Sequence, residues 1–168
     1  AVAAALFAVL GYTLASTGFG AHDIRVDAAY AVAYSVAFLS LTSVFALTVL
    51  VAPTLLRDVE HRMAEIVYAT AVTKTQYLLG RLAGSFAAAA TAFLFGIAGM
   101  IAGRLAHEPG RLAPFQAWPY VWAFAVLALP SMAFIAALLF AIAAATRSTL
   151  ATYIGGVVLY VLYFASAV

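Results

Sequence analysis

Long apolar stretches without a single charged side chain constrain this chain more than any other feature. They cover approximately residues 1–16, 30–52, 82–103, 120–145 and 149–168, and none contains Asp, Glu, Lys, Arg or His. All but the first reach the about 20 residues that a membrane-spanning helix needs. Their apolar residues are continuous rather than alternating, which favours helices over the strands of a barrel. The sequence therefore predicts an all-α fold, a polytopic bundle of transmembrane helices.

Composition excludes a soluble domain. The 168 residues are 67% hydrophobic and 8% charged, whereas soluble domains carry about 25% charged residues. The chain has no cysteine, which rules out disulfides, thiolate metal sites and cysteine nucleophiles. A net charge of +2 is too small to indicate a nucleic-acid partner. The apolar composition predicts instead that the chain is surrounded by the lipid bilayer. Because both ends fall inside apolar runs, without a signal peptide at the start, we expect a piece of a longer protein.

The positively charged residues predict the orientation of the bundle. Five of the eight Lys and Arg residues lie in residues 53–81 and 146–148, and three lie in the other two connections. Cytoplasmic connections are enriched in Lys and Arg, so we expect residues 53–81 to face the cytoplasm. Trp118, Tyr120 and Trp122 then mark the outer membrane interface at the start of the fourth stretch.

The connection at residues 53–81 is long and polar. From Thr54 to Tyr68, apolar residues recur at steps of three and four while charged residues fill the remaining positions, which predicts an amphipathic helix too charged to span a membrane. Thr73 and Gln76 have the spacing of a capping box, so a new helix is expected to begin near Lys74 and continue into the third stretch. A solvated interfacial loop that binds nothing remains an open alternative.

Three segments of this connection resemble a known family. Residues 57–65 (RDVEHRMAE), 70–74 (TAVTK) and 77–81 (YLLGR) are similar to the first cytoplasmic connection of type-2 ABC transporter permeases. The sequence departs from that pattern at Ala71, where the family usually has Pro, and at residues 62–63, where Gly-Thr is common. The resemblance implies a cytoplasmic coupling helix that docks on a separate ABC ATPase. The contact residues it implies are Arg57, Asp58, Glu60, His61, Glu65 and Lys74.

The same resemblance implies a function and a location. The chain would be the permease part of an ATP-driven exporter in the bacterial inner membrane, with ATP bound by the partner subunit and with a second permease half or a second copy as partner. Residues 145–153 are similar to a subgroup whose permease is fused to a zinc aminopeptidase-like domain. The alternative is therefore a membrane anchor for an extracytoplasmic peptidase-like enzyme, without transport.

The residues offer no catalytic, cofactor or metal site within this piece, so we do not expect it to be an enzyme. There is no Gly-rich phosphate loop followed by Lys-Ser/Thr, and no pair of His residues four apart. The uncharged stretches also disfavour an ion-coupled transporter, which usually carries an ionisable residue within the membrane. Gly80 with Gly84, and Gly99 with Gly103, predict close helix packing. Pro130 predicts a kink, either a flexion point or a static feature.

Overall fold

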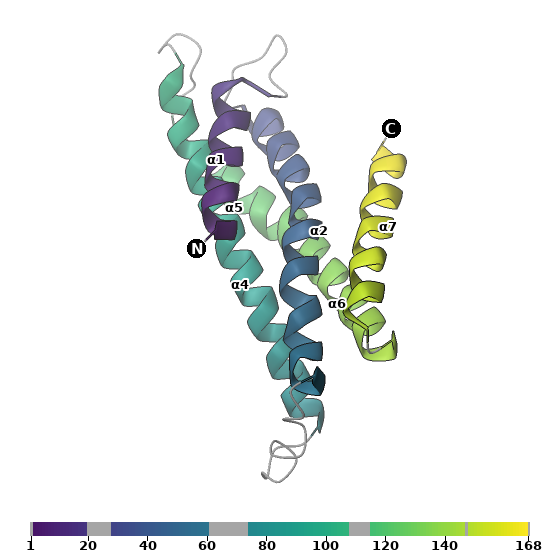
Figure 1. Cartoon of the computed structure of the whole chain (residues 1–168). Coiled ribbons are helices and arrows are strands. Elements are labelled where there is room, and N and C mark those ends of the chain that lie inside the picture. Colours follow the sequence, from purple (N-terminus) through teal and green to yellow (C-terminus); the bar gives the residue numbers. More distant parts are fainter. Residues whose placement is uncertain (1, 20–27, 61–73, 108–114, 147, 168) are drawn as a thin grey trace. The chain divides into compact units, whose positions relative to one another are not determined.

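The described part of the protein is 93% helical. The computed structural model describes residues 2–19, 28–60, 74–107, 115–146 and 148–167, with only the backbone described for residues 51–60, Lys74, Tyr163, Ser166 and Ala167. Within these ranges no strand occurs, which confirms the all-α prediction. The elements are α1 (Val2–Ser16), α2 (Ala29–Glu60), α4 (Lys74–Gly103), the 3₁₀ turn η1 (Arg104–Ala106), α5 (Trp118–Ala123), the π-helical η3 (Phe124–Ala128), α6 (Leu129–Thr146) and α7 (Thr149–Ala167) (Figure 1).

Three stretches of helix are long and apolar enough to cross a membrane. They are Ala29–Leu50, Thr75–Ala106 and Trp118–Thr146, the last formed by α5, η3 and α6 in succession. The apolar helices α1 and α7 are shorter than these in the described part of the chain. Helices of this length and composition place the chain in a lipid bilayer, so it is an integral membrane protein.

Two helix boundaries differ in how well the sequence predicted them. The prediction that a helix begins near Lys74 is confirmed, because α4 begins at that residue. The predicted span at residues 30–52 lies close to the apolar segment Ala29–Leu50, but no break separates this span from the helical residues that follow it. One uninterrupted helix, α2, continues through Pro53 to Glu60. Pro removes one hydrogen bond and displaces one carbonyl, which a helix packed among others tolerates.

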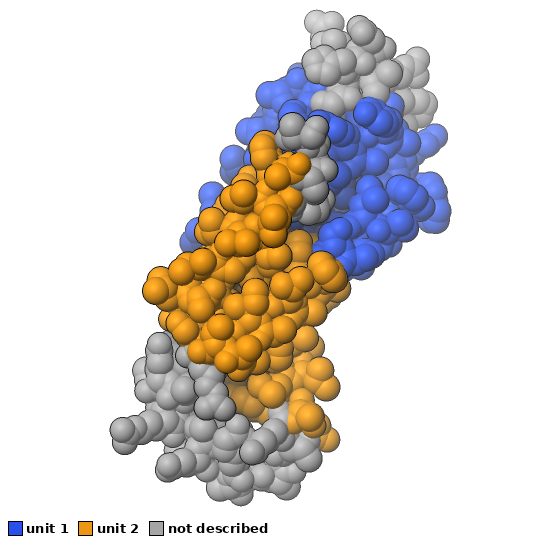
Figure 2. Space-filling model, turned by 90° about the vertical axis from the view of Figure 1, so that its right-hand side faces the viewer, with its two compact units in different colours: residues 1–43, 90–131 blue, residues 44–89, 132–168 orange. Residues whose placement is uncertain are grey.

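The described chain divides into two compact units, coloured separately in Figure 2. Unit 1 comprises residues 1–43 and 90–131, and unit 2 comprises residues 44–89 and 132–168. In unit 1 the core is built around Phe93, which is fully buried and contacts Phe7 and Phe124 at ring-centroid distances of 5.9 and 5.7 Å. Val36 and Leu39 of α2 complete this core. Aromatic rings at such spacings attract each other beyond their area of contact.

In unit 2, α7 packs closely through small and aromatic residues. A side chain added at Gly156 would lie 2.3 Å from the hydroxyl of Thr48 on α2, so the missing Cβ is what lets the two helices approach. Gly155 likewise faces Ile142 on α6. One turn further along α7, the ring of Tyr160 lies 4.4 Å from that of Phe45. Small residues that admit a neighbouring helix are the usual means of association in lipid.

A row of glycines joins α1 and α4 in unit 1. A Cβ at Gly99 would lie 2.1 Å from the carbonyl oxygen of Ala8, and one at Gly11 would lie 2.0 Å from the carbonyl oxygen of Gly96. Gly103 makes a similar approach to the backbone of α1 at Tyr12. The predicted close packing of Gly99 and Gly103 is therefore confirmed, and its partner is α1.

The same prediction for Gly80 and Gly84 is wrong in the described part of the chain. A Cβ added at either residue would meet nothing within 4 Å. In both pairs the glycines are four residues apart. Only Gly99 and Gly103 lie opposite a described helix, α1, whose backbone comes so close that a side chain would not fit.

The long helix from Trp118 to Thr146 departs from α geometry just before Pro130. Residues 124–128 form a π-helix, and the backbone N–H of Leu129 bonds to the carbonyl of Phe124, five residues back. The hydroxyl of Ser131 donates a 2.7 Å hydrogen bond to the carbonyl of Leu127. A π-turn and a neighbouring hydroxyl together accommodate a Pro that cannot donate to the preceding turn.

Candidate functional site

The charged residues predicted to contact an ATPase lie at two helix ends. Arg57, Asp58 and Glu60 lie on the final turn of α2, and Lys74 is the first residue of α4. The last part of α2 and the first part of α4 belong to unit 2 and lie at the same end of it (Figure 1). His61 and Glu65 lie outside the described residues, as does the rest of the predicted amphipathic helix. The structure thus brings together the helices that carry four of the six residues.

Both helices are longer than a bilayer core requires. The 32 residues of α2 span about 48 Å at 1.5 Å per residue, whereas the hydrocarbon core is about 30 Å thick. The apolar segment Ala29–Leu50 accounts for about 33 Å of that length. Residues 51–60 therefore form a continuous helical extension of a span, about 15 Å long, that ends in charged residues.

The backbone dipoles favour Arg57 at the end of α2 but disfavour the two acids there and the Lys at the start of α4. Asp58 and Glu60 lie at the C-terminal end of α2, where the macrodipole is negative and disfavours carboxylates. Lys74 lies at the N-terminal end of α4, where the macrodipole is positive, and the first turn of α4 contains no acid. Each mismatch is worth about 0.3–1 kcal/mol at an exposed site. Groups of opposite charge on another surface would relieve both.

In the described apolar helices, the buried Ser and Thr hydroxyls donate hydrogen bonds to backbone carbonyls. Thr48 donates to the carbonyl of Val44 at 2.7 Å, Ser85 to Leu82 at 3.0 Å and Thr152 to Ser148 at 3.1 Å. The other buried Ser and Thr hydroxyls in the described residues belong to Ser35, Ser40 and Ser43, and each also donates to a backbone carbonyl. In the described ranges no cluster of three or more His, Cys, Asp or Glu residues could hold a metal ion.

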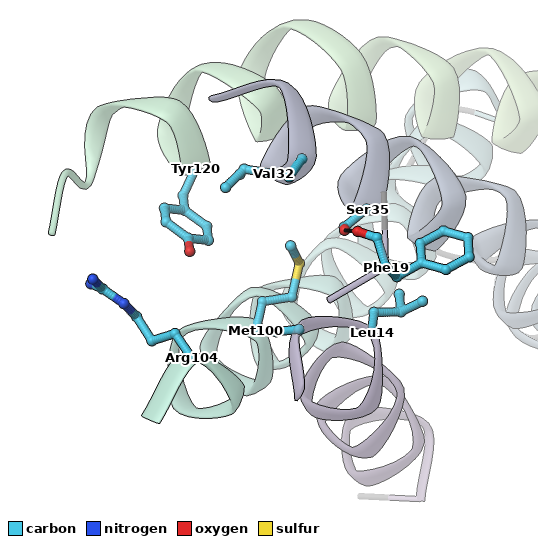
Figure 3. A pocket seen from close by; sticks show the side chains of 9 residues that line it. Leu14, Phe19, Val32, Ser35, Met100, Arg104 and Tyr120 are labelled. Carbon is cyan, nitrogen blue, oxygen red and sulfur yellow. Dashed lines mark hydrogen bonds between the residues drawn. The ribbon is translucent and has the colours of Figure 1, made fainter. Parts of the chain in front are cut away.

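A small pocket lies in unit 1 where α1 ends. Gly18, with φ 68°, ends the helix in a Schellman motif: the N–H of Phe19 bonds to Leu14 and that of Gly18 to Ala15. The hydroxyl of Ser35 then holds the carbonyl of Phe19 at 3.3 Å (Figure 3). The pocket is lined by Leu14, Ala15, Phe19, Ala31, Val32, Ser35, Met100, Arg104 and Tyr120.

This pocket is too small to be a substrate site. Its volume is about 10 Å³, close to the least that one water occupies, whereas small-molecule sites measure about 300–1,000 Å³. Arg104 and Tyr120 both border it (Figure 3). Tyr120 is only 6% exposed, so its side chain packs inside unit 1, whereas Trp118 and Trp122 are exposed. Sequence reasoning missed the pocket, although Gly18 after a helical run was a signal for the helix end that shapes it.

The charged helix ends of unit 2 are the candidate functional site. Comparison of this chain with protein-family models, with curated proteins and with solved structures finds no match.

Proposed function

We propose that this chain is the permease part of an ATP-driven transporter, and that the charged ends of α2 and α4 dock a cytoplasmic ATPase. The observation that carries the proposal is the unbroken helix from Ala29 to Glu60. A span and its charged end in a single helix form a stiff lever, because a force applied at Asp58 or Glu60 passes into the bilayer without a flexible link.

Two further features support this proposal. The apolar stretches 30–52, 82–103, 120–145 and 149–168 contain no Asp, Glu, Lys, Arg or His that could couple an ion gradient to transport, which favours an energy source outside these stretches. The charges at the two helix ends include both signs, and an opposing surface of complementary pattern would relieve the dipole mismatch at Asp58, Glu60 and Lys74. Residues 57–81 resemble the coupling segment of type-2 ABC permeases, and on this ground the proposed partner is an ABC ATPase.

The test is co-purification of an ATP-hydrolysing subunit from the native membrane with a tagged full-length protein. The wild-type protein should retain ATPase activity at low salt and lose most of it near 1 M salt, where the screening length falls from about 10 Å to about 3 Å. The double variant Asp58→Lys, Glu60→Lys should retain at least tenfold less ATPase activity. Glu108→Lys, expected to lie on the opposite side of the membrane, is the matched control and should behave as wild type.

Two outcomes would contradict the proposal in different ways. Undiminished ATPase binding by the double variant would refute the assignment of Asp58 and Glu60 as contact residues. Absence of any ATPase at low salt, with an intact and folded membrane protein, would refute the transporter proposal itself and favour the anchor of an extracytoplasmic enzyme.

A further inference from the structure

We propose that unit 1 binds phospholipid headgroups through a patch at the junction of α4 and α5, and that Arg104 contacts the lipid phosphate there. We call this surface the aromatic patch, defined as Leu105, Phe115, Trp118 and Trp122 together with Arg104. The proposal is independent of whether an ATPase docks on unit 2.

The aromatic patch contains four exposed large apolar side chains. Trp118 is 71% exposed, Trp122 45%, Phe115 53% and Leu105 82%. In water such a surface would be unfavourable, since large apolar side chains stabilise a protein chiefly by leaving water. Trp has an apolar ring and one N–H donor, and it is enriched where a bilayer meets water for that reason.

The helical period of α5 joins the aromatic patch to the lipid-facing side of a span. Trp118 and Trp122 are four residues apart and lie on one face of the helix, which Val121 continues as an exposed apolar residue. On the opposite face, Tyr120 and Ala123 are buried in unit 1. α5 forms the beginning of the apolar span Trp118–Thr146. We therefore expect lipid to cover the exposed face of α5 as it covers the rest of the span.

Arg104 provides the positive charge of the aromatic patch. It follows Gly103 at the end of α4, close to the end of the apolar segment Thr75–Ala106, where a span reaches the headgroups. Its guanidinium carbon lies 4.8 Å from the centre of the Phe115 ring, which in turn lies 6.2 Å from the ring of Tyr120. A guanidinium has five N–H donors and binds phosphate well, so it can keep these contacts and still reach a lipid phosphate.

The two halves of the junction must reach the same membrane boundary. α4 ends at Gly103 and α5 begins at Trp118, and the connection between them is too short to cross a bilayer core of about 30 Å as a helix. Arg104 and Trp118 therefore lie near one headgroup layer, and the ring that Arg104 contacts there is that of Phe115. An anionic phospholipid can contact both groups. Its phosphate binds Arg104, and the upper part of its acyl chains packs against the aromatic rings.

Intrinsic fluorescence tests this directly, because Trp118 and Trp122 are the only tryptophans in the chain. The full chain is reconstituted in phosphatidylcholine vesicles containing lipid brominated at carbons 6 and 7 or at carbons 11 and 12, and iodide is used as the aqueous quencher. With Trp122→Phe, the remaining Trp118 should be quenched at least 1.5-fold more by the shallow bromines than by the deep ones. Strong iodide quenching without lipid quenching, or no quenching by any agent, would overturn the proposal.

The role of Arg104 is tested by a preference for anionic lipid. Quenching of Trp118 by brominated phosphatidylglycerol should exceed quenching by the equally brominated phosphatidylcholine by about twofold, and Arg104→Gln should abolish the difference. Arg81→Gln is the matched control, because Arg81 also lies over an aromatic ring, that of Tyr77 at 5.1 Å, but near the start of α4. A preference that survives in Arg104→Gln, or that is lost in both variants, would contradict the phosphate contact.

Discussion

Replacing Gly99 by Ala probes the glycine contact between α1 and α4 with a single methyl group. The added Cβ would lie 2.1 Å from the carbonyl oxygen of Ala8, 2.9 Å from its carbonyl carbon and 3.0 Å from the amide nitrogen of Tyr12. All three atoms are backbone, so no side-chain rotation relieves the overlap. Bringing the shortest contact to 3.4 Å requires α1 to move away by about 1.3 Å.

Such a displacement would loosen the rest of the seam, including the ring contact of Phe7 with Phe93. Overpacking of this kind destabilises proteins by about 1–3 kcal/mol, and we expect the upper half of that range because the obstacle is backbone. Gly11→Ala meets Gly96 from the other side at 2.0 Å and should have an effect of similar size.

The assay is unfolding in mixed micelles by titration with SDS, followed by circular dichroism, with Gly80→Ala and Gly84→Ala as controls. These two glycines lie in the same helix with nothing within 4 Å, so their replacement measures the change in helix propensity without the contact. The free energy of unfolding should fall by about 2–3 kcal/mol for Gly99→Ala and stay level or rise by up to about 1 kcal/mol for the controls. Equal effects in both pairs would refute the close seating of α1 on α4.

Three other substitutions test the packing by the same titration. Gly156→Ala should lower the free energy of unfolding by about 1–3 kcal/mol, because the new methyl group overlaps the side chain of Thr48; no change would argue against the seating of α7. Phe93→Ala should lower it by about 3–5 kcal/mol through the cavity it leaves, while exposed Phe95→Ala should have little effect, and a reversed order would contradict the assigned core. Gly18→Ala should destabilise the end of α1 by about 1–2 kcal/mol because its φ of 68° is left-handed, and Gly18→Asn should do so less.

The sequence was sufficient to predict the elements because lipid leaves little choice. An uncharged apolar run must satisfy its backbone internally, so a helix followed from composition alone. The start of α4 at Lys74 was also readable, from the spacing of Thr73 and Gln76. The continuity of α2 past residue 52 was not readable, since the connection was expected to begin at Pro53.

Helix faces were harder to predict than helix bounds. Spans such as α6 are apolar all round, so no periodic pattern distinguishes the side that packs on protein from the side that faces lipid. This is why Tyr120 and Trp122 had the same expected environment although one is buried and the other exposed. For the same reason, equal spacing could not separate Gly99, which lies against α1, from Gly84, which meets nothing within 4 Å.

The candidate site was predicted as a set of charges rather than as a shape. Arg57, Asp58, Glu60 and Lys74 were selected by a family resemblance, and the structure adds that they lie at the ends of helices that continue into the spans. That continuity was not apparent from the sequence, because Pro53 and the charged residues after it resemble a connection rather than the end of a span.

Accessibility of Glu60 from the two sides of the membrane tests the central claim most directly. The chain has no native cysteine, so single variants Glu60→Cys and His107→Cys in the full-length protein can be treated with a membrane-impermeant maleimide. In intact cells His107→Cys should react and Glu60→Cys should not, and Glu60→Cys should react once the membrane is permeabilised. Labelling of Glu60→Cys from outside intact cells would place the charged helix ends on the wrong side for an ATPase and contradict the account.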